Sequence, residues 1–475
     1  MAAHQCRPGA GWVDLAHHLI AATMLFAVLH FLEHKQMLEW LDAAMIRIAA
    51  VGGSPLPAQR DAAEAQRPSI IEIDRKAYES VFAEQAPLNR ARLVELLDQI
   101  DRQRTGVLAI DIDLSPTVSE RAAGVKRELD LALARLVRRG IRVVLALPST
   151  AASAPGSNLA WVRARCVDGV AFADPTLHER LGVVSRVHID TPTLALVARA
   201  LAAAPGGEHG DVALAGRVCS LAAHQQDEQV FQDSVTGADE AGTHVVHPAA
   251  EPRPLNPIAS DWRFLRTASH GMGLIKGAAA IEDSASLRHV VFIGGSYADT
   301  ERFVTIGGPA SGLAVHAASY ISLALDTDDA PLWMVALLDL AIGVAIGFSF
   351  QWIWGKYAAY EKNLGAFQLC CAWWRKFTML RFALLGIWLL PLLAAYIAMY
   401  ASAQFFTSGM WLNPGPIIIG MFLHTLSLRH THHSEEQNSA EKHDSVLHRL
   451  VSEHPASVFI QLPLTALLLV LASIH

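Results

Sequence analysis

The sequence predicts an α/β domain, with a largely parallel sheet and flanking helices, joined to an α-helical transmembrane bundle. Hydrophobic residues make up 52% of the 475 residues, and the mean hydropathy is +0.28. These values are high for a soluble protein and low for an all-membrane one. The charged residues crowd between about residues 55 and 305, where short β-branched runs alternate with amphipathic stretches. One water-soluble domain is therefore expected between membrane segments.

Several segments approach the length of about 20 apolar residues that a membrane-spanning helix needs. The first is interpreted as an uncleaved anchor, because few positive charges precede it and no small-residue cleavage site follows it. The last carries Gln461 and Pro463 and has the weakest signal. The expected spans are residues 11–33, 331–354, 382–401, 411–428 and 456–474.

The loop at residues 355–381 sets the orientation. It carries five lysines and arginines against one acid, Glu361, and short basic loops stay in the cytoplasm. Counting across the spans places the domain at 67–330 outside the cytoplasm. The N-terminus at 1–10 and the His-rich segment at 429–455 fall inside. The predicted fold class is thus an α/β extracytoplasmic domain plus an α-helical transmembrane bundle.

The elements of the expected domain follow in order. A helical juxtamembrane stretch and linker occupies residues 34–66, with a Gly- and Pro-rich break at 51–60. The apolar runs predict strands buried on both faces, and their alternation with helices predicts a parallel sheet. Residues 203–261 are weakly patterned and are expected to form a long loop or an irregular insertion. The predicted strands are 69–74, 106–114, 141–147 and 289–295, and the predicted helices include 89–103 and 127–139.

Four stretches carry a family resemblance. "IIEIDRKAYE", "APLNRARLVELLDQI", "GVLAIDIDLSP" and "HVVFIGGSYADTERFVTIGGPASGLAVHAASYISLAL" resemble, in order and spacing, the CHASE domain of the second type. The resemblance covers about residues 69 to 428. It implies an extracytoplasmic sensory module of bacterial receptors, held between one N-terminal membrane helix and three C-terminal ones.

The sequence departs from this pattern in two places. Ile306 follows Thr305 where the family usually has proline. Typical members also continue into a cytoplasmic kinase or cyclase, whereas this sequence ends at residue 475. The resemblance therefore implies sensing, and we expect the output to come from a separate membrane or cytoplasmic protein partner.

Four aspartates are the candidate ligand-binding residues. Asp74, Asp111 and Asp113 lie at the ends of predicted parallel strands, where open α/β sheets bind ligands. Together with Asp299 they are candidates to bind a cation or a polar small molecule. The alternative is that they cap helices and orient loops. His316 is expected to bury its ring and donate a hydrogen bond within the fold.

Asp339, Gly343 and Gly347 are candidates for a helix contact within the second span. A charged side chain there costs about 3 kcal/mol on insertion scales and usually has a partner. The two glycines form a small-residue face that allows close helix packing. The contact is expected within the bundle or with a second protein. The alternative is a protonated Asp339 beside His18 or His424.

The remaining features exclude several classes of function. A net charge of −7 and a pI near 6.3 argue against nucleic-acid binding. We expect no catalytic site, because no Walker loop, serine elbow or "HExxH" motif occurs. No metal or cofactor is expected, and the His-rich segment is interpreted as a solvated connector. Cys166 and Cys219 either pair in an oxidising compartment or remain two buried thiols.

The sequence thus predicts a multi-pass protein of the bacterial inner membrane, in contact with membrane lipid, with a periplasmic domain. The domain would detect an envelope signal and relay it through the membrane helices to a separate partner. The alternative function is a structural or accessory subunit of an envelope complex that uses the domain as a docking surface. The oligomeric state, including a homo-oligomer, is left open.

Overall fold

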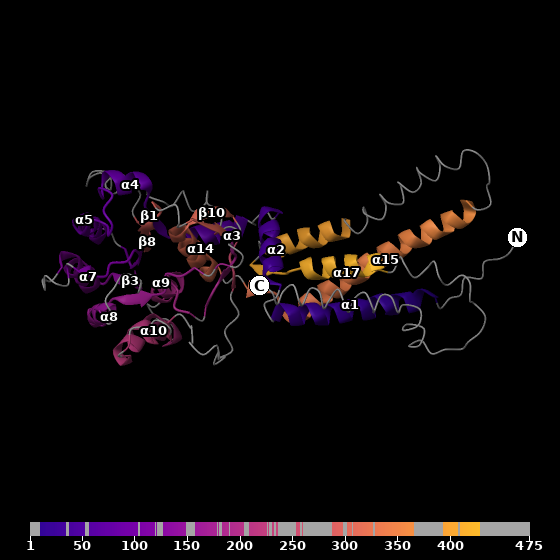
Figure 1. The fold of residues 1–475 in the computed structure, drawn as a ribbon, viewed down its shortest axis with the longest axis horizontal. Coiled ribbons are helices and arrows are strands. Elements are labelled where there is room, and N and C mark those ends of the chain that lie inside the picture. The colour runs from indigo at the N-terminus through magenta and orange to yellow at the C-terminus, as the bar shows by residue number, and fades with distance from the viewer. Residues whose placement is uncertain are drawn as a thin grey trace. The chain divides into compact units, whose positions relative to one another are not determined.

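The computed structural model of the chain describes residues 10–427 with gaps, and the described part forms two compact units. The first unit is Met1–Gly52, Ala330–Gln404 and Leu412–His475, and the second is Gly53–Asp329 and Phe405–Trp411. Figure 1 shows the elements of both units. The gaps are 35–37, 53–56, 103–104, 119, 121–126, 149–156, 178, 180–182, 190, 204–208, 226, 228–229, 232–233, 236–252, 257–258, 260–286, 298–301, 306, 326–327, 365–392 and 407–408.

A five-stranded parallel sheet forms the centre of the second unit. The strand order is β1-β8-β2-β3-β4. All four predicted strands are confirmed, and β4 is an addition that pairs with β3. The strands are β1 (Ser69–Ile73), β2 (Val107–Asp111), β3 (Arg142–Ala146), β4 (Ala171–Ala173) and β8 (Val290–Gly295).

Helices cover both faces of this sheet because its strands alternate two apolar faces. Ile71 and Ile110 point into the core formed with α5 (Arg90–Asp101) and α7 (Glu128–Arg138). On the opposite face Phe292 of β8 packs against Tyr320 of α14 (Gly312–Ala324). The helix α9 (Leu194–Ala203) lies beside α14 on that face and contacts β2 and β3. Figure 1 shows the two helix pairs on opposite sides of the strands.

Two further helices pack at the β4 edge, where the sequence prediction was partly wrong. The helix α8 (Ser157–Val167) packs on β4. The helix α10 (His209–His224) falls in the stretch predicted as a loop or insertion. Val218 and Ala222 of α10 are fully buried in the core. The glycines and histidines of α10 hid its apolar face, and burial against β4 stabilises a helix that propensity alone did not predict.

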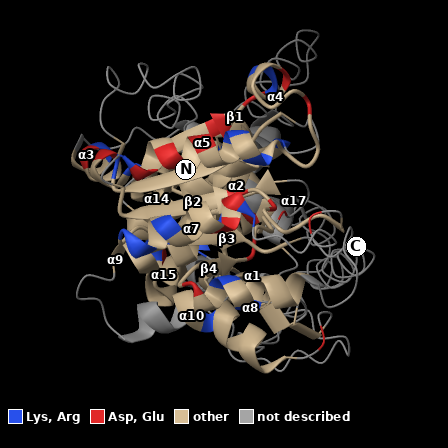
Figure 2. Ribbon diagram, turned by 90° about the vertical axis from the view of Figure 1, so that its left-hand side faces the viewer, with Lys and Arg blue, Asp and Glu red and all other residues tan. Residues whose placement is uncertain are grey.

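Short strand pairs complete the second unit. The strands β5 (Val183–Val184), β9 (Arg302–Thr305) and β10 (Gly308–Ser311) form one small sheet. The strands β6 (Arg186–Val187) and β7 (Arg253–Pro254) pair antiparallel. The strands β11 (Asp328–Asp329) and β12 (Met410–Trp411) pair parallel. The helices α3 (Pro57–Gln66) and α4 (Arg75–Ser80) flank β1 in the chain. Figure 2 shows charged residues on α3 and α4.

Four helices of the first unit share one core. They are α1 (Ala10–His34), α15 (Leu332–Leu364), α17 (Gly415–Ser427) and the helix Leu393–Phe406, which belongs to this unit as far as Gln404. The shorter helix α2 (Glu39–Gly52) contacts α17. Ala22, Ile346, Ala398 and Met421 meet in the core of this unit. Among the described residues one stretch, Leu332–Ser349, is long and apolar enough to cross a membrane. A bundle of several spans therefore stays a prediction.

The predicted helix contact lies inside this unit. Gly343 is buried against α1, and a Cβ atom at this position would come within 2.8 Å of the Cβ of Ala22. Gly347 is also buried, and Asp339 is 8% exposed. The absence of a side chain at Gly343 thus permits the close approach of α1 and α15 within one chain.

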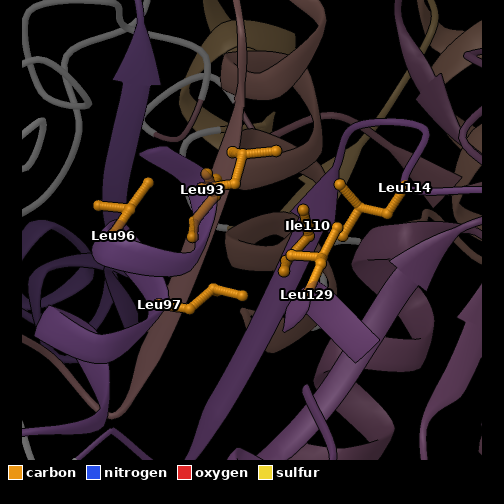
Figure 3. Close-up of a pocket in the computed structure, with 7 residues that line it drawn as sticks. Leu93, Leu96, Leu97, Ile110, Leu114 and Leu129 are labelled. Carbon is orange, nitrogen blue, oxygen red and sulfur yellow. The ribbon is translucent and has the colours of Figure 1, made fainter. Parts of the chain in front are cut away.

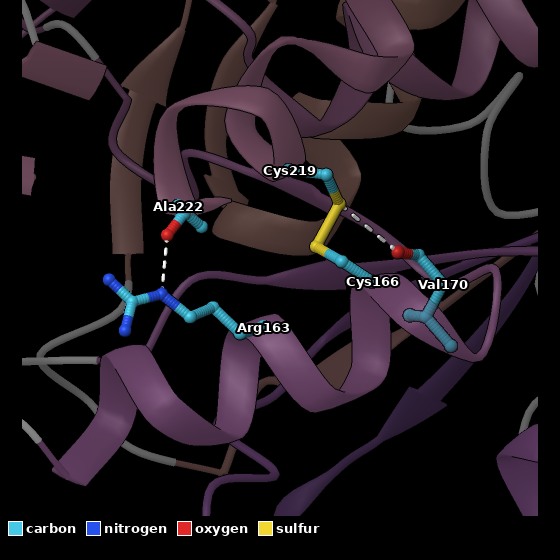
Figure 4. Close-up of a disulfide and its surroundings, with 5 residues drawn as sticks. All are labelled: Arg163, Cys166, Val170, Cys219 and Ala222. Atoms are coloured by element: carbon cyan, nitrogen blue, oxygen red, sulfur yellow. Dashed lines mark hydrogen bonds between the residues drawn. A yellow bond between two sulfur atoms is a disulfide. The ribbon is translucent and has the colours of Figure 1, made fainter. Parts of the chain in front are cut away.

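The structure joins Cys166 of α8 to Cys219 of α10 by a disulfide, with a Cα–Cα distance of 5.6 Å (Figure 4). Arg163 of α8 donates a hydrogen bond to the carbonyl of Ala222, which adds a second link between the two helices. The Sγ of Cys219 lies 3.4 Å from the carbonyl oxygen of Val170; a disulfide sulfur has no proton to donate, so this is a packing contact. Disulfides persist in oxidising compartments, in agreement with an extracytoplasmic domain.

Removing this disulfide is expected to destabilise the domain. The bridge closes a loop with a sequence separation of 53 residues, so the double variant C166S/C219S should lose about 2–4 kcal/mol of unfolding free energy. The midpoint of chemical unfolding of the full chain in detergent measures the loss. A reducing agent should lower the midpoint of the unmodified protein and leave that of the variant unchanged. Equal midpoints for the oxidised protein and the variant would contradict the prediction.

Candidate functional site

Two of the predicted aspartates at the sheet edge form capping hydrogen bonds. A third, Asp111, lies beside the helix α14. Asp74 is the N-cap of α4, and its Oδ1 accepts a hydrogen bond from Ala77 N at 2.8 Å. The Oδ1 of Asp113 accepts one from Ser115 N at 2.8 Å. Both contacts agree with the alternative that these residues cap helices and orient loops. Asp299 lies outside the described residues.

Asp111 takes part in a different arrangement, on the face that α14 covers. The register places Glu72 of β1 and Asp111 of β2 on either side of Gly294 in β8. The N-cap of α14, Ser311, donates a hydrogen bond to Glu72 Oε1 at 3.1 Å. In the second turn of α14, His316 Nε2 lies 3.8 Å from Asp111 Oδ2. Two carboxylates therefore flank the beginning of this helix.

Gly294 makes this arrangement possible. A Cβ atom at position 294 would come within 2.8 Å of Leu313 Cδ1 and 3.2 Å of Asp111 Cβ. Without a side chain at 294, Leu313 packs directly on the backbone of β8. The helix α14 is consequently buried along almost its whole length, from Gly312 to Leu323.

Burial raises the pKa of the Asp111 carboxyl above its ordinary value of 3.8, and the nearby His316 opposes the rise. The side chain is 19% exposed. Within the described residues, His316 is the one titratable side chain that contacts it, at 3.8 Å. The low polarity around the carboxylate explains the direction of the pKa shift, because desolvation disfavours the charged form.

One gap in the core lies between α5 and the sheet and is apolar (Figure 3). Leucines of α5, including Leu93 and Leu97, point toward Ile110, Leu114 and Leu129 across a space of about 10 Å³. A single water molecule needs about that volume together with polar partners. We therefore interpret this gap as a packing defect of the core and not as a ligand site.

A second pocket lies on the other side of the sheet. Six of its ten lining residues have polar side chains, so we call it the polar pocket, although apolar atoms make up most of its exposed lining. It has space of about 20 Å³ between α14, the beginning of α9, and the segment around β5 and β6. His316 and Ser319, three residues apart on α14, line it together with residues of the other two elements. The complete lining is Thr176, Leu177, Val184, Arg186, Val187, His188, Thr193, Ala195, His316 and Ser319.

Arg186 connects this pocket to the end of the domain. Its guanidinium donates two hydrogen bonds to the carboxylate of Asp329 in β11, at 2.7 and 3.2 Å. The neighbouring residue of β11, Asp328, forms an ion pair with Arg253 of β7 at 2.9 Å. The backbone of β11 also pairs with β12, where Asp328 N donates to Gly409 O at 3.1 Å. We call β11, β12, Arg186 and Arg253 the strand clasp.

The strand clasp directly precedes α15, which contains the described stretch that is long and apolar enough to cross a membrane. Only Ala330 and Pro331 separate β11 from α15. The other strand, β12, lies in Phe405–Trp411, which belongs to the domain although the helices on either side of it belong to the first unit.

The described residues contain no group of three or more His, Cys, Asp or Glu side chains that could hold a metal ion. Glu72, Asp111 and His316 thus offer charge and hydrogen bonding at this site without forming a ligand set of that kind.

The match to a family model identifies the chain. A model of the CHASE2 domain matches residues 20–349, more than half of the sequence. The chain belongs to the CHASE2 family. CHASE2 is an extracytoplasmic sensory domain family, so the resemblance noted in the sequence is confirmed. Comparison with curated proteins and with solved structures finds no match.

The CHASE2 match extends beyond the sheet at both ends. It begins within α1 and ends within α15, so the family pattern includes helices of the first unit as well as the domain. The short linker from the strand clasp to α15 lies inside the match. β12 and α17 lie after it.

Sequence reasoning missed the polar pocket and the strand clasp of this CHASE2 domain. Two-residue strands have no periodicity to detect, and Arg186 lies 143 residues from Asp329. One sequence signal could have indicated the strand clasp: the acidic pair Asp328–Asp329 lies just before an apolar segment. Charged side chains that become partly buried there need partners of opposite charge.

Replacing Asp111 by asparagine should change how the stability of the CHASE2 domain depends on pH. Because the folded-state pKa is raised, folding favours the protonated carboxyl. The stability that the protonated Asp111 carboxyl contributes is fully present below its ordinary pKa of 3.8. This stability is lost as pH rises through the raised pKa of the folded state. Asp111→Asn should therefore unfold at a higher urea concentration than the unmodified chain at about pH 7.

The two unfolding midpoints should converge as pH falls toward 3.8. Asp113→Asn is the matched control, since it removes one charge from the same segment. A midpoint of Asp111→Asn that lies below that of the unmodified protein at neutral pH would show instead that the pairing with His316 outweighs desolvation.

Proposed function

We propose that this CHASE2 protein is a sensor of the bacterial inner membrane, which detects an envelope signal in its external domain and relays it through its membrane helices to a separate protein. The observation that carries the proposal is the position of Arg186. This residue lines the polar pocket and also binds Asp329 in the strand clasp. A change in the pocket therefore has a direct route to the beginning of α15.

The helix α14 supplies a second route between the same points. It begins at Ser311, which is bonded to Glu72, and His316 and Ser319 face the pocket from its middle turns. It ends at the C-cap Leu325, shortly before β11. Since α14 is buried along its length, it moves as a rigid element, and packed helices of this kind shift by small displacements.

The ion pairs of the strand clasp are weak enough for ligand binding to break them. The side chains of Arg186 and Asp329 are 22% and 34% exposed, and those of Arg253 and Asp328 are 30% and 55% exposed. Ion pairs with this exposure contribute about 0.2–1 kcal/mol each. A ligand shifts a two-state equilibrium only by its difference in affinity for the two states, and a difference of this size is enough to offset one of these ion pairs.

The position of β12 supports the proposed multi-pass topology. The positive-inside rule places the turn between the third and fourth predicted spans on the same side as the domain. That turn contains Phe405–Trp411, which is part of the domain's compact unit.

Arg186→Gln tests the relay. We expect the backbone amide of Asp328, which is bonded to Gly409 O, to exchange with deuterium about five times faster, because a loss of roughly 1 kcal/mol corresponds to that factor. Hydrogen exchange with mass spectrometry on the full chain in lipid nanodiscs measures it. Amides of β2 should not change. Arg302→Gln, an exposed arginine on β9, is the control, and equal exchange in the two variants would refute the relay.

The alternative function is a non-catalytic accessory subunit of an envelope complex, with the domain as a docking surface. The small volumes of the described pockets, about 10 and 20 Å³, favour it, because they leave little room for a large ligand. Purification from the native membrane in mild detergent separates the two functions. A stoichiometric partner present without any stimulus supports the subunit, and a partner whose recovery changes with Arg186→Gln supports the sensor.

A further inference from the structure

We propose that the polar pocket is a binding site for a small carboxylate, which competes with Asp329 for Arg186 and so loosens the strand clasp. The proposal rests on the proposed sensor function and adds to it the chemical class of the ligand. It follows from the chemistry of the lining, from the burial of that lining and from the double role of Arg186.

The polar lining residues all carry hydrogen-bond donors. They are one arginine, two histidines and three hydroxyl residues, and no aspartate or glutamate lines the space. The guanidinium of Arg186 matches the two oxygens of a carboxylate. Its present partner is a carboxylate, that of Asp329, bound in this two-contact geometry.

The beginning of α9 adds a favourable electrostatic field. Thr193 and Ala195, which precede and follow the first residue of this helix in the chain, both line the pocket. Thr193 Oγ1 accepts a hydrogen bond from Leu196 N at 3.4 Å. The first amide of the helix, Leu194 N, donates to Asp174 O at 3.2 Å, and the helix dipole places positive potential at this end. An anion is therefore favoured at this position.

The helix α14 adds two buried polar side chains to the lining. Ser319 is 5% exposed and His316 is 1% exposed, and both line the pocket. The hydroxyl of Ser319 can donate a hydrogen bond to a carboxylate.

Because the pocket is small, a ligand can enter only if residues of the strand clasp move. The space of about 20 Å³ holds one water molecule, and a carboxylate is larger. Entry therefore requires Arg186 and β6 to move. Because Arg186 has one guanidinium, a carboxylate in the pocket takes over hydrogen bonds that Asp329 now accepts. Binding is thus expected to lower the stability of β11 within the domain while it raises the stability of the domain as a whole.

The test uses the full chain in lipid nanodiscs with acetate as the probe, and with acetamide as a neutral probe of the same shape. Ionic strength is held constant with chloride. We expect acetate to raise the melting temperature in a saturable way and to increase deuterium exchange at the Asp328 amide. Acetamide and chloride should do neither. A response to acetate that equals the response to chloride would overturn the site, since it would be a general salt effect.

Two variants separate the site from the clasp. Arg186→Gln should abolish the acetate-dependent rise in melting temperature. Arg253→Gln breaks the other ion pair of the clasp but does not line the pocket, so it should keep that rise. An acetate effect that survives in Arg186→Gln would refute the proposed site.

The outcome also distinguishes this inference from the proposed function. If Arg186→Gln speeds exchange at Asp328 while acetate has no effect on the unmodified protein, the relay holds and the carboxylate site is wrong. If acetate stabilises the protein through Arg186 without changing exchange at Asp328, the site holds and its connection to the clasp is wrong.

Discussion

The close packing of α14 on strand β8 is the constraint on which the site depends. Gly294 has no side chain, so Leu313 lies directly on β8 between the carboxylates of Glu72 and Asp111. This contact sets the depth of the helix on the sheet. It also sets the rotation of the helix, because residues three apart share a face and His316 and Ser319 therefore both reach the polar pocket. A larger residue at 294 would lift the helix and widen the pocket at the same time.

Much of the domain follows from local pattern. Strands β1, β2, β3 and β8 are short runs rich in Val and Ile, and their burial on both faces is a property that sequence alone predicts well. The N-caps at Asp74 and Asn89 also have standard sequence signals. Residues at strand ends were harder to assign. A cap and a ligand-binding aspartate have the same sequence signature there, and only the hydrogen bonds of Asp74 and Asp113 distinguish the two.

The remaining features could not be predicted because they are set by distant contacts. The strand clasp brings together segments from residues 186, 253, 328 and 410, and none of its strands exceeds two residues. Such strands exist because ion pairs and neighbouring backbone hold them, and local propensity contributes little. The pocket depends in the same way on three elements that meet only in the folded domain. The sequence therefore predicted four of the five strands of the sheet and did not predict β4, α10, the pocket or the strand clasp.

The parallel pairing of β11 with β12 restricts how the following helices can move. The two strands are in register, Asp328 with Met410 and Asp329 with Trp411. Two residues then lead to α15, and Leu412 to Pro414 lead to α17. Strand pairs change register in whole residues of about 3.3 Å, and each step of one residue reverses the side-chain faces. While the ladder is intact, a piston-like slide of α15 along α17 is therefore limited to what these short linkers absorb, and tilting or rotation becomes the easier movement.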